Sequence, residues 1–189
     1  MGQSTSQFGL LRPIQDTELA LMLSWRNAPA VRQNMYTIHE ITLEEHLAWW
    51  EGTRESSRHR YFMYEYAGAP QGIVGFTGID RANENSSWAF YASPEAPKGS
   101  GSRMEVLALD YAFQELGLHK LCCEVLAFNT PVIRLHEKFG FRVEGVLRDQ
   151  YKRDDEFIDI YCLGLLSEEW AEARDEMIAK LTRLSKGQS

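Results

Sequence analysis

One glycine-rich turn constrains this chain more than any other feature: Lys98-Gly-Ser-Gly-Ser-Arg103 joins an expected strand to an expected helix. An aromatic strand pattern at 87–91 precedes the turn, and apolar residues recur at helical spacing from Val106 to Leu116 after it. Two glycines let the backbone turn tightly and direct several N–H groups to one place, where the helix dipole adds positive potential. The turn therefore favours an anionic phosphate group, although an ordinary glycine-rich turn has the same pattern. Its spacing fits neither the Walker motif nor the dinucleotide-binding fingerprint.

Helices come early in the rest of the pattern, and strands dominate the middle. An apolar stripe predicts a helix around Leu19–Leu23, and Thr42 caps a second one with Glu45 at the reciprocal capping-box position. Asn129 or Thr130 caps a later helix, and a polar helix runs from 167 to about 184. We expect strands at 8–14, 61–66, 72–79, 87–91, 120–126, 142–147 and 157–166. This order predicts one α+β domain with a mostly antiparallel mixed sheet flanked by helices.

Length and charge limit the function classes. The 189 residues suit a single domain at 8–185, with flexible tails at 1–7 and 186–189. The net charge of −7 gives little general affinity for nucleic acid. No apolar run approaches the ~18 residues that span a bilayer, and the polar first residues carry no secretory pattern. We therefore expect a cytoplasmic protein with no nucleic-acid or membrane partner. The five histidines and three cysteines form no metal motif, so no metal is expected.

A second motif, taken together with the glycine turn, indicates the function of the turn. Asn129-Thr-Pro-Val-Ile-Arg-Leu-His-Glu-Lys-Phe-Gly-Phe141 follows one strand later, and the two segments together resemble the GNAT acyl-CoA N-acetyltransferase superfamily over roughly 10–166. The resemblance implies acetyl-CoA as co-substrate, with backbone amides of the turn on the pyrophosphate and Asn129 on the pantetheine arm. Ala96 departs from the family's Gln or Arg. The residues that the resemblance assigns to the CoA site are Phe90, Lys98, Gly99, Ser100, Gly101, Ser102, Arg103 and Asn129.

The resemblance also concerns the strand that precedes the glycine turn. In this fold that strand, with Trp88, Phe90 and Tyr91, splays from its neighbour and leaves N–H groups free. Such donors can pair with pantetheine and polarise the thioester carbonyl, as in an oxyanion hole. A side chain at Gly101 is expected to clash with the bound pyrophosphate.

The acceptor residues are expected in the first two helices. Their segments 24–27, 31–36 and 44–50, with 88–91 and 134–141, resemble the amino-sugar acetyltransferases of pseudaminic acid synthesis. This resemblance implies acetylation of the 4-amino group of UDP-4-amino-4,6-dideoxy-N-acetyl-β-L-altrosamine. A UDP sugar needs cations for its phosphates and rings or polar groups for its uracil. The candidate substrate-binding residues are Arg26, His46, Thr77 and Tyr91.

Two residues are candidates for proton transfer. Glu124 and His136 are twelve positions apart, which resembles the Glu and Tyr pair of the superfamily's ribosomal-protein acetyltransferases. Glu124 is then the base, acting through water, and His136 the acid for the CoA thiolate, with Tyr91 as a further proton donor. His136 is expected at the edge of the apolar face of its helix. A purely structural interpretation pairs Glu124 with Lys120 instead.

Three functions remain open from the sequence: a nucleotide-sugar acetyltransferase, a ribosomal-protein-type N-terminal acetyltransferase, and a non-catalytic acyl-CoA-binding sensor. Candidate residues at Glu124, Asn129 and His136 weaken the sensor interpretation. The acidic net charge slightly favours a small substrate over a ribosome-bound one. Acetyl-CoA and a UDP-amino sugar are the expected partners, and the sequence leaves open whether two chains form a homodimer.

Overall fold

The computed structural model describes residues 5–186. The strands are β1 (Leu10–Pro13), β2 (His59–Tyr66), β3 (Ala69–Asp80), β4 (Asn85–Ala92), β5 (Lys120–Leu126), β6 (Arg142–Arg153) and β7 (Glu156–Leu166). The α-helices are α1 (Leu19–Asn27), α2 (Pro29–Arg32), α3 (Leu43–Arg54), α4 (Ser100–Asp110), α5 (Thr130–Lys138) and α6 (Ser167–Lys186). Three short helical turns complete the order: η1 (Ser6–Phe8), η2 (Asp16–Glu18) and η3 (Tyr111–Glu115). Residues 1–4 and 187–189 of the predicted tails lie outside the described residues.

All strands join one sheet in the order β1-β2-β3-β4-β5-β7-β6. Neighbouring strands are antiparallel except for β4 and β5, whose parallel pairing runs only from Asn85↔Lys120 to Ser87↔Cys122. The predicted mostly antiparallel mixed sheet is therefore confirmed. The one parallel pair ends early, and the two strands then diverge.

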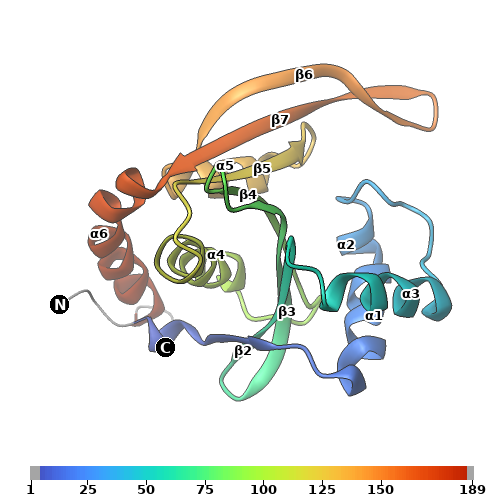
Figure 1. Ribbon diagram of the computed structural model, residues 1–189, viewed down its shortest axis with the longest axis horizontal. Coiled ribbons are helices and arrows are strands. Elements are labelled where there is room, and N and C mark those ends of the chain that lie inside the picture. The colour runs from blue at the N-terminus through green and yellow to red at the C-terminus, as the bar shows by residue number, and fades with distance from the viewer. Residues whose placement is uncertain (1–4, 187–189) are drawn as a thin grey trace.

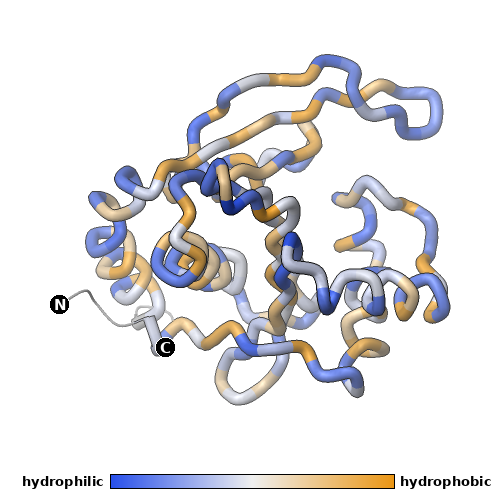
Figure 2. The backbone as a smooth tube through the Cα atoms, viewed as in Figure 1, coloured by the Kyte–Doolittle hydropathy of each residue, from blue (hydrophilic) through white to orange (hydrophobic). Residues whose placement is uncertain are grey.

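Helices cover both faces of the central strands, with α1, α2 and α3 on one side and α4 and α6 on the other (Figure 1). The larger core lies on the α4 side and includes Phe76, Leu109, Leu163 and Trp170. A smaller core, with Met22 among its residues, joins α1 and α3 to β2 and β3. Hydrophobic residues concentrate along these strands and along α4 (Figure 2). Both faces of the sheet are thus buried, which fits the near-continuous apolar pattern of β3.

Strand β4 contributes to both cores because successive side chains of a strand point to opposite faces. Trp88 belongs to the α4-side core and Phe90 packs against it. Tyr91 instead packs against the core of α1 and α3. One short strand therefore contacts both layers of helices.

Two local features differ from the sequence prediction. Thr42 does cap α3, since its hydroxyl accepts a hydrogen bond from the Glu45 N–H at 3.2 Å. The Glu45 carboxylate does not complete a capping box but faces His39 at 3.1 Å. Strand β6 is also longer than the predicted 142–147, and with β7, which lies where it was predicted, it forms a hairpin that reaches toward α2 (Figure 1). There Arg153 donates hydrogen bonds to the carbonyls of Gln33 and Met35, so tertiary contacts order a polar segment.

Candidate active site

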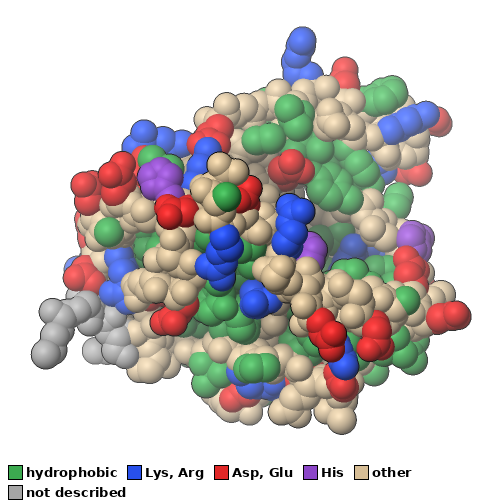
Figure 3. Space-filling view, in the orientation of Figure 1, with side chains coloured by type: hydrophobic (Ala, Val, Ile, Leu, Met, Phe, Trp, Pro, Cys, Tyr) green, Lys and Arg blue, Asp and Glu red, His purple; other side chains and the backbone are tan. Residues whose placement is uncertain are grey.

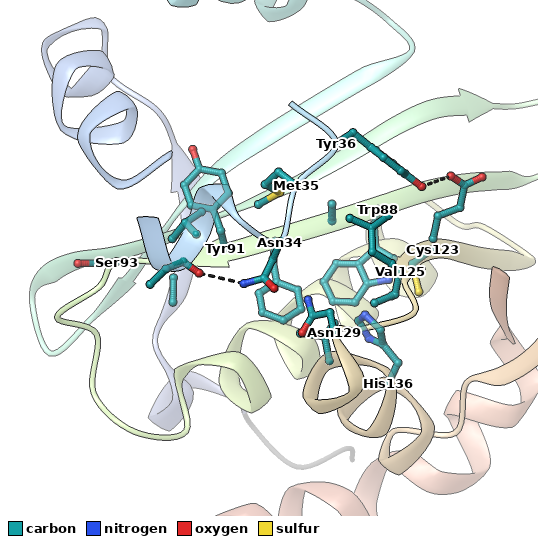
Figure 4. A pocket seen from close by; sticks show the side chains of 18 of the residues that line it. Asn34, Met35, Tyr36, Trp88, Tyr91, Ser93, Cys123, Val125, Asn129 and His136 are labelled. Atoms are coloured by element: carbon teal, nitrogen blue, oxygen red, sulfur yellow. Dashed lines mark hydrogen bonds between the residues drawn. The ribbon is translucent and has the colours of Figure 1, made fainter. Parts of the chain in front are cut away.

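The divergence of β4 and β5 opens a cleft in the middle of the sheet. Beyond Ser87 and Cys122, β4 pairs only with β3 and β5 only with β7. A cavity of about 390 Å³ lies between the two inner strand edges. We call it the strand cleft; its walls are β4, β5, the start of α5 and the segment that follows α2 (Figure 4). Because these edges lack a strand partner, backbone N–H groups of β4 are available to a molecule in the cleft.

The glycine turn lies where the loop after β4 enters α4. Gly99 is the N-cap of α4 and has a φ of +88°, a conformation that favours glycine. Ser100 is buried, and its hydroxyl donates a 2.7 Å hydrogen bond to the carbonyl of Pro97. Ser102 lies in the first turn of α4 and is half-buried. The turn therefore holds the positive end of α4 in a fixed position, as an anionic group requires.

The two cations of the turn differ in their contacts. The Lys98 side chain is exposed. The Arg103 guanidinium instead lies 4.3 Å from the centre of the Tyr66 ring, and its Nη1 donates to the Lys98 carbonyl at 3.2 Å. Arg103 thus braces the loop, while Lys98 is free to meet a ligand phosphate. Figure 3 shows Lys and Arg side chains beside a hollow in one face of the molecule, whose other edges are largely hydrophobic and neutral.

Gly101 lies where α4 packs closely against α5 and β4. A Cβ atom at this position would lie 3.2 Å from Leu135 Cδ2 and 3.6 Å from Phe90 Cε2. A side chain here would therefore crowd Leu135 and Phe90 beside the strand cleft. The expected clash with a bound pyrophosphate stays a prediction.

Asn129 lies at the mouth of the strand cleft, as the N-cap of α5. Its backbone carbonyl accepts hydrogen bonds from Val132 and Ile133, but its side chain makes no capping hydrogen bond. Figure 4 shows the Asn129 amide directed into the cleft, on the same side as His136. The amide is thus available to hydrogen-bond a ligand that enters between the strands.

His136 lies deeper in the same cleft, and its ring is only 3% exposed. The expectation that it lies at the edge of the apolar helix face is wrong, since it is buried between Ile133 and Phe139. Its Nδ1 is 2.8 Å from Oε1 of Glu105, a carboxyl group on α4 with no exposed surface. Burial raises the pKa of Glu105.

Sequence reasoning missed Glu105 because a glutamate in an amphipathic helix usually faces water. A signal was present. Leu109, Ala112 and Leu116 follow Glu105 at the i+4, i+7 and i+11 positions of one helix face, and all three are buried. The helical period therefore places this carboxyl group inside the protein.

Glu124 also lines the strand cleft, so the two predicted proton-transfer residues share one cavity. Its carboxylate accepts a 2.7 Å hydrogen bond from the hydroxyl of Tyr36, as Figure 4 shows. The structural alternative, a pair with Lys120, is wrong because Lys120 binds Glu144 at 2.8 Å. Burial and the Glu124 carboxylate raise the pKa of Tyr36, which keeps its hydroxyl protonated and donating.

A second cavity of about 320 Å³ lies on the other face of β4, among α1, α3, β2 and β3. We call it the helix cavity. Arg26, His46 and Tyr91 all line it, so the structure brings together three of the four predicted substrate residues. Thr77 lines neither cavity, which corrects its prediction. It pairs with His59 and Ser87 farther along β3 than the cavity extends.

Three of the side chains that line the helix cavity carry a buried polar atom without a hydrogen-bond partner among residues 5–186: Nη1 of Arg26, Nε2 of His46 and Oη of Tyr91. Burial lowers the pKa of both Arg26 and His46 and raises that of Tyr91. Buried polar atoms normally have partners, so these three side chains have unused hydrogen-bonding capacity beside the cavity. Phe90 and Tyr91 line both cavities, which places the strand cleft and the helix cavity on opposite sides of one strand.

No described helix has the length and apolar character needed to cross a membrane. Within residues 5–186, no group of three or more His, Cys, Asp or Glu side chains is placed to hold a metal ion.

Known proteins resemble this chain over most of its length. Residues 10–142 match the family described as acetyltransferase (GNAT) domain. The chain is 29% identical over 164 residues to the SPbeta prophage-derived uncharacterized N-acetyltransferase YokL of Bacillus subtilis, covering 85% of this chain and 90% of that protein. It is 27% identical over 138 residues to acetyltransferase PseH of Campylobacter jejuni, with 73% and 85% covered. It is 29% identical over 143 residues to spermidine N(1)-acetyltransferase of Escherichia coli, with 75% and 76% covered.

A solved structure agrees with the fold. Spermidine N-acetyltransferase from Vibrio cholerae, in complex with CoA and spermine, superposes with a TM-score of 0.81 at 23% identity, covering 88% of this chain and 99% of that one. The predicted fold class is therefore confirmed. By the family match over residues 10–142, the chain belongs to the GNAT acetyltransferase family and is an N-acetyltransferase that uses acetyl-CoA.

Proposed function

We propose that this N-acetyltransferase acetylates the 4-amino group of a UDP-linked amino-deoxy sugar, UDP-4-amino-4,6-dideoxy-N-acetyl-β-L-altrosamine, in pseudaminic acid biosynthesis. The observation that carries the proposal is the set of unpartnered buried atoms on Arg26, His46 and Tyr91. The similarity to acetyltransferase PseH supports it. A cation and neutral polar groups in one cavity suit an acceptor that is anionic and rich in hydroxyl groups.

The helix cavity also offers rings. Trp49 stacks on His46 at 5.4 Å and contacts Tyr61 edge to face at 5.0 Å. Aromatic rings suit the flat uracil and the apolar faces of a sugar. Arg26 Nη2 already donates to the Thr37 carbonyl at 3.2 Å, which holds the guanidinium in place and leaves Nη1 for a phosphate. Sugar and nucleotide can thus be bound by different parts of one cavity.

A polyamine is the competing acceptor, because spermidine acetyltransferases are also similar to this chain. A polycationic acceptor needs carboxylates and is repelled by a buried guanidinium. Among the described residues that line the helix cavity, Glu45 is the one carboxylate, and it already pairs with His39 at 3.1 Å. Arg26 lines the same cavity, so its charge favours the anionic sugar nucleotide.

In the proposed reaction the sugar amine attacks the thioester carbonyl of acetyl-CoA in the strand cleft. Backbone N–H groups of β4 bind pantetheine and polarise the carbonyl, and Lys98 and the amides of the turn at 99–103 bind the pyrophosphate. Glu124 accepts the proton of the amine through water. His136 gives a proton to the departing thiolate. Tyr91, whose hydroxyl has no partner in the described part of the chain, is the alternative donor on the acceptor side.

An acceptor comparison tests the proposal directly. Thiol release from acetyl-CoA is measured with the UDP-amino sugar, with spermidine, with a ribosomal-protein N-terminal peptide and with no acceptor. We expect the highest kcat/KM with the UDP-amino sugar. A higher value with spermidine or the peptide contradicts the sugar assignment, and binding of acetyl-CoA without release in any arm indicates a sensor.

Removing the polar atoms of the helix cavity should weaken acceptor binding. Arg26→Ala and His46→Ala should each raise the KM for the UDP-amino sugar about ten- to a hundred-fold, since a hydrogen bond to a charged group contributes about 1.5–3 kcal/mol. The affinity for acetyl-CoA should stay nearly unchanged. Arg54→Ala is the matched control, because this arginine lies on α3 and pairs with Asp16 outside both cavities. Wild-type KM values in both variants would place the acceptor elsewhere.

Gly101 tests the link between helix packing and the CoA site. Gly101→Val should push α4 away from Leu135 and Phe90, which lowers Tm and raises the KM for acetyl-CoA. Gly52→Ala is the control, because a Cβ there meets nothing within 4 Å inside α3. That control should gain roughly 0.5–1 kcal/mol of stability with no change in KM. An unchanged acetyl-CoA affinity of Gly101→Val in calorimetry would separate the turn from CoA binding.

His136 should affect turnover more than binding. His136→Gln keeps an amide that can hydrogen-bond Glu105 but removes the titrating ring, so the variant should fold. We expect kcat to fall about a hundred-fold or more, with a much smaller change in the KM for acetyl-CoA. His136→Tyr should recover part of the rate if proton donation is the role. Full kcat in His136→Gln would leave the donor role to Tyr91 or to unaided thiolate departure.

A further inference from the structure

The buried carboxyl group of Glu105 has one visible partner. Its Oε1 lies 2.8 Å from Nδ1 of His136, and its Oε2 has no hydrogen-bond partner among the described residues. The His136 ring is enclosed by Trp88, Phe90 and Phe141, with ring-centre distances of 5.2–6.0 Å. These rings exclude water from the Nδ1 side. Nε2 is the remaining ring nitrogen, and His136 lines the strand cleft (Figure 4).

We propose that Glu105 and His136 share one proton and work as a single acid, in which Glu105 is a positioning residue that keeps Nε2 of His136 protonated toward the strand cleft. This inference rests on the proposed donor role of His136. In this proposal Glu105 on α4 acts on the reaction through the imidazole ring of His136 and does not contact the substrate.

The burial of the pair decides how many protons it holds. If Glu105 were ionised beside a neutral imidazole, a net negative charge would lie in the core with Oε2 unpartnered, which is costly. One added proton makes the pair neutral overall. That proton lies on Glu105 and is accepted by Nδ1, or it lies on Nδ1 as an ion pair. In both arrangements Nε2 carries a hydrogen, so the cleft side of the ring is a donor.

Neighbouring groups act on the pair in opposite directions. Burial raises the pKa of Glu105, whereas the charges of His136 and of Lys138 on α5 lower it. Cys123 on β5 is near enough for the Glu105 charge to act on it, and burial raises the pKa of this thiol so that it stays neutral. On β4 the facing side chains are Trp88 and Phe90, which do not titrate. Desolvation is the largest of these effects, which favours the neutral pair.

The proton transfer then balances as follows. The C–S bond of the tetrahedral intermediate breaks and its electron pair goes to sulfur. The hydrogen on Nε2 moves to that sulfur to give the CoA thiol, and the shared proton stays on, or moves to, Nδ1. The pair becomes a Glu105 carboxylate that accepts a hydrogen bond from the neutral His136 ring. The proton that Glu124 took from the amine passes to solvent, and solvent in the strand cleft returns one proton to Nε2 for the next turnover, so no net charge remains.

The titration of His136 tests the pair without acetyl-CoA or acceptor. Nitrogen-15 NMR of histidine-labelled protein, with His136 assigned by its loss in His136→Gln, follows Nδ1 and Nε2 against pH. We expect Nε2 to carry its hydrogen at pH 7 and the pair to lose its shared proton in one step as pH rises. In Glu105→Gln the midpoint should fall by about 1–3 units, because the carboxylate no longer stabilises the shared proton. A wild-type ring with hydrogen on Nδ1 alone at pH 7, or an unmoved midpoint, would overturn the proposal.

Kinetics then separate positioning from packing. In the wild type kcat should decline as pH rises through the midpoint of the pair, and in Glu105→Gln this decline should begin about 1–3 units lower. In the His136→Gln background, Glu105→Gln should cause no further loss of kcat. An equal loss at every pH and in both backgrounds would show a packing role and overturn the proposal. If Glu105→Gln does not fold, the wild-type titration decides. Failure of every acceptor would overturn the proposed function but leave the titration result standing.

Discussion

The early end of the β4–β5 pairing is the constraint on which the rest of the site depends. A parallel pair of only three register positions leaves two strand edges without partners in the middle of a sheet. Unpaired backbone groups in such a place are unfavourable unless a ligand or water binds them. The family's acetyl-CoA supplies such a ligand, because a pantetheine arm carries amide groups that can replace the missing strand. The gap in the sheet is thus the site at which we propose that the co-substrate binds.

Helix α5 carries two of the cleft's polar side chains, because it begins at the mouth of the cleft and runs into its interior. Asn129 lies at the first cap of α5, and His136 follows two turns later on the same side. The close contact of α4 and α5 at Gly101 fixes this helix against β4. It also brings Glu105, one turn after Gly101 on α4, to the ring of His136. The same glycine therefore shapes the helix entrance and the buried pair.

Much of this arrangement could be predicted from the sequence. Apolar periodicity indicated the strands and helices, and the motif at 129–141 indicated two cleft residues, Asn129 and His136. Helical periodicity predicted the burial of a single side chain less well than it predicted the helix itself. His136, for example, is buried and does not lie at the edge of the apolar face. Thr77 was misplaced because alternation along a strand gives the face but not how far a cavity extends. The β6–β7 hairpin was underestimated because contacts distant in sequence, such as Arg153 with Met35, order it.

Two electrostatic effects act on the acceptor: the net charge of the whole chain at long range, and the charge of Arg26 at short range. The whole chain carries a net charge of −7, which repels an anionic sugar nucleotide and attracts a polyamine at long range. That effect is screened beyond about 8 Å at physiological ionic strength. The charged side chains that line the helix cavity are Glu45, which pairs with His39, and half-buried Arg26, whose Nη1 has no partner among the described residues; charges in such a place are screened far less. Under the proposed function, the local cation outweighs the global charge in the choice of acceptor. Because Arg26 and Tyr91 line the same cavity and Tyr91 also borders the strand cleft, an acceptor held by the arginine would lie beside the strand along which we propose that the thioester binds.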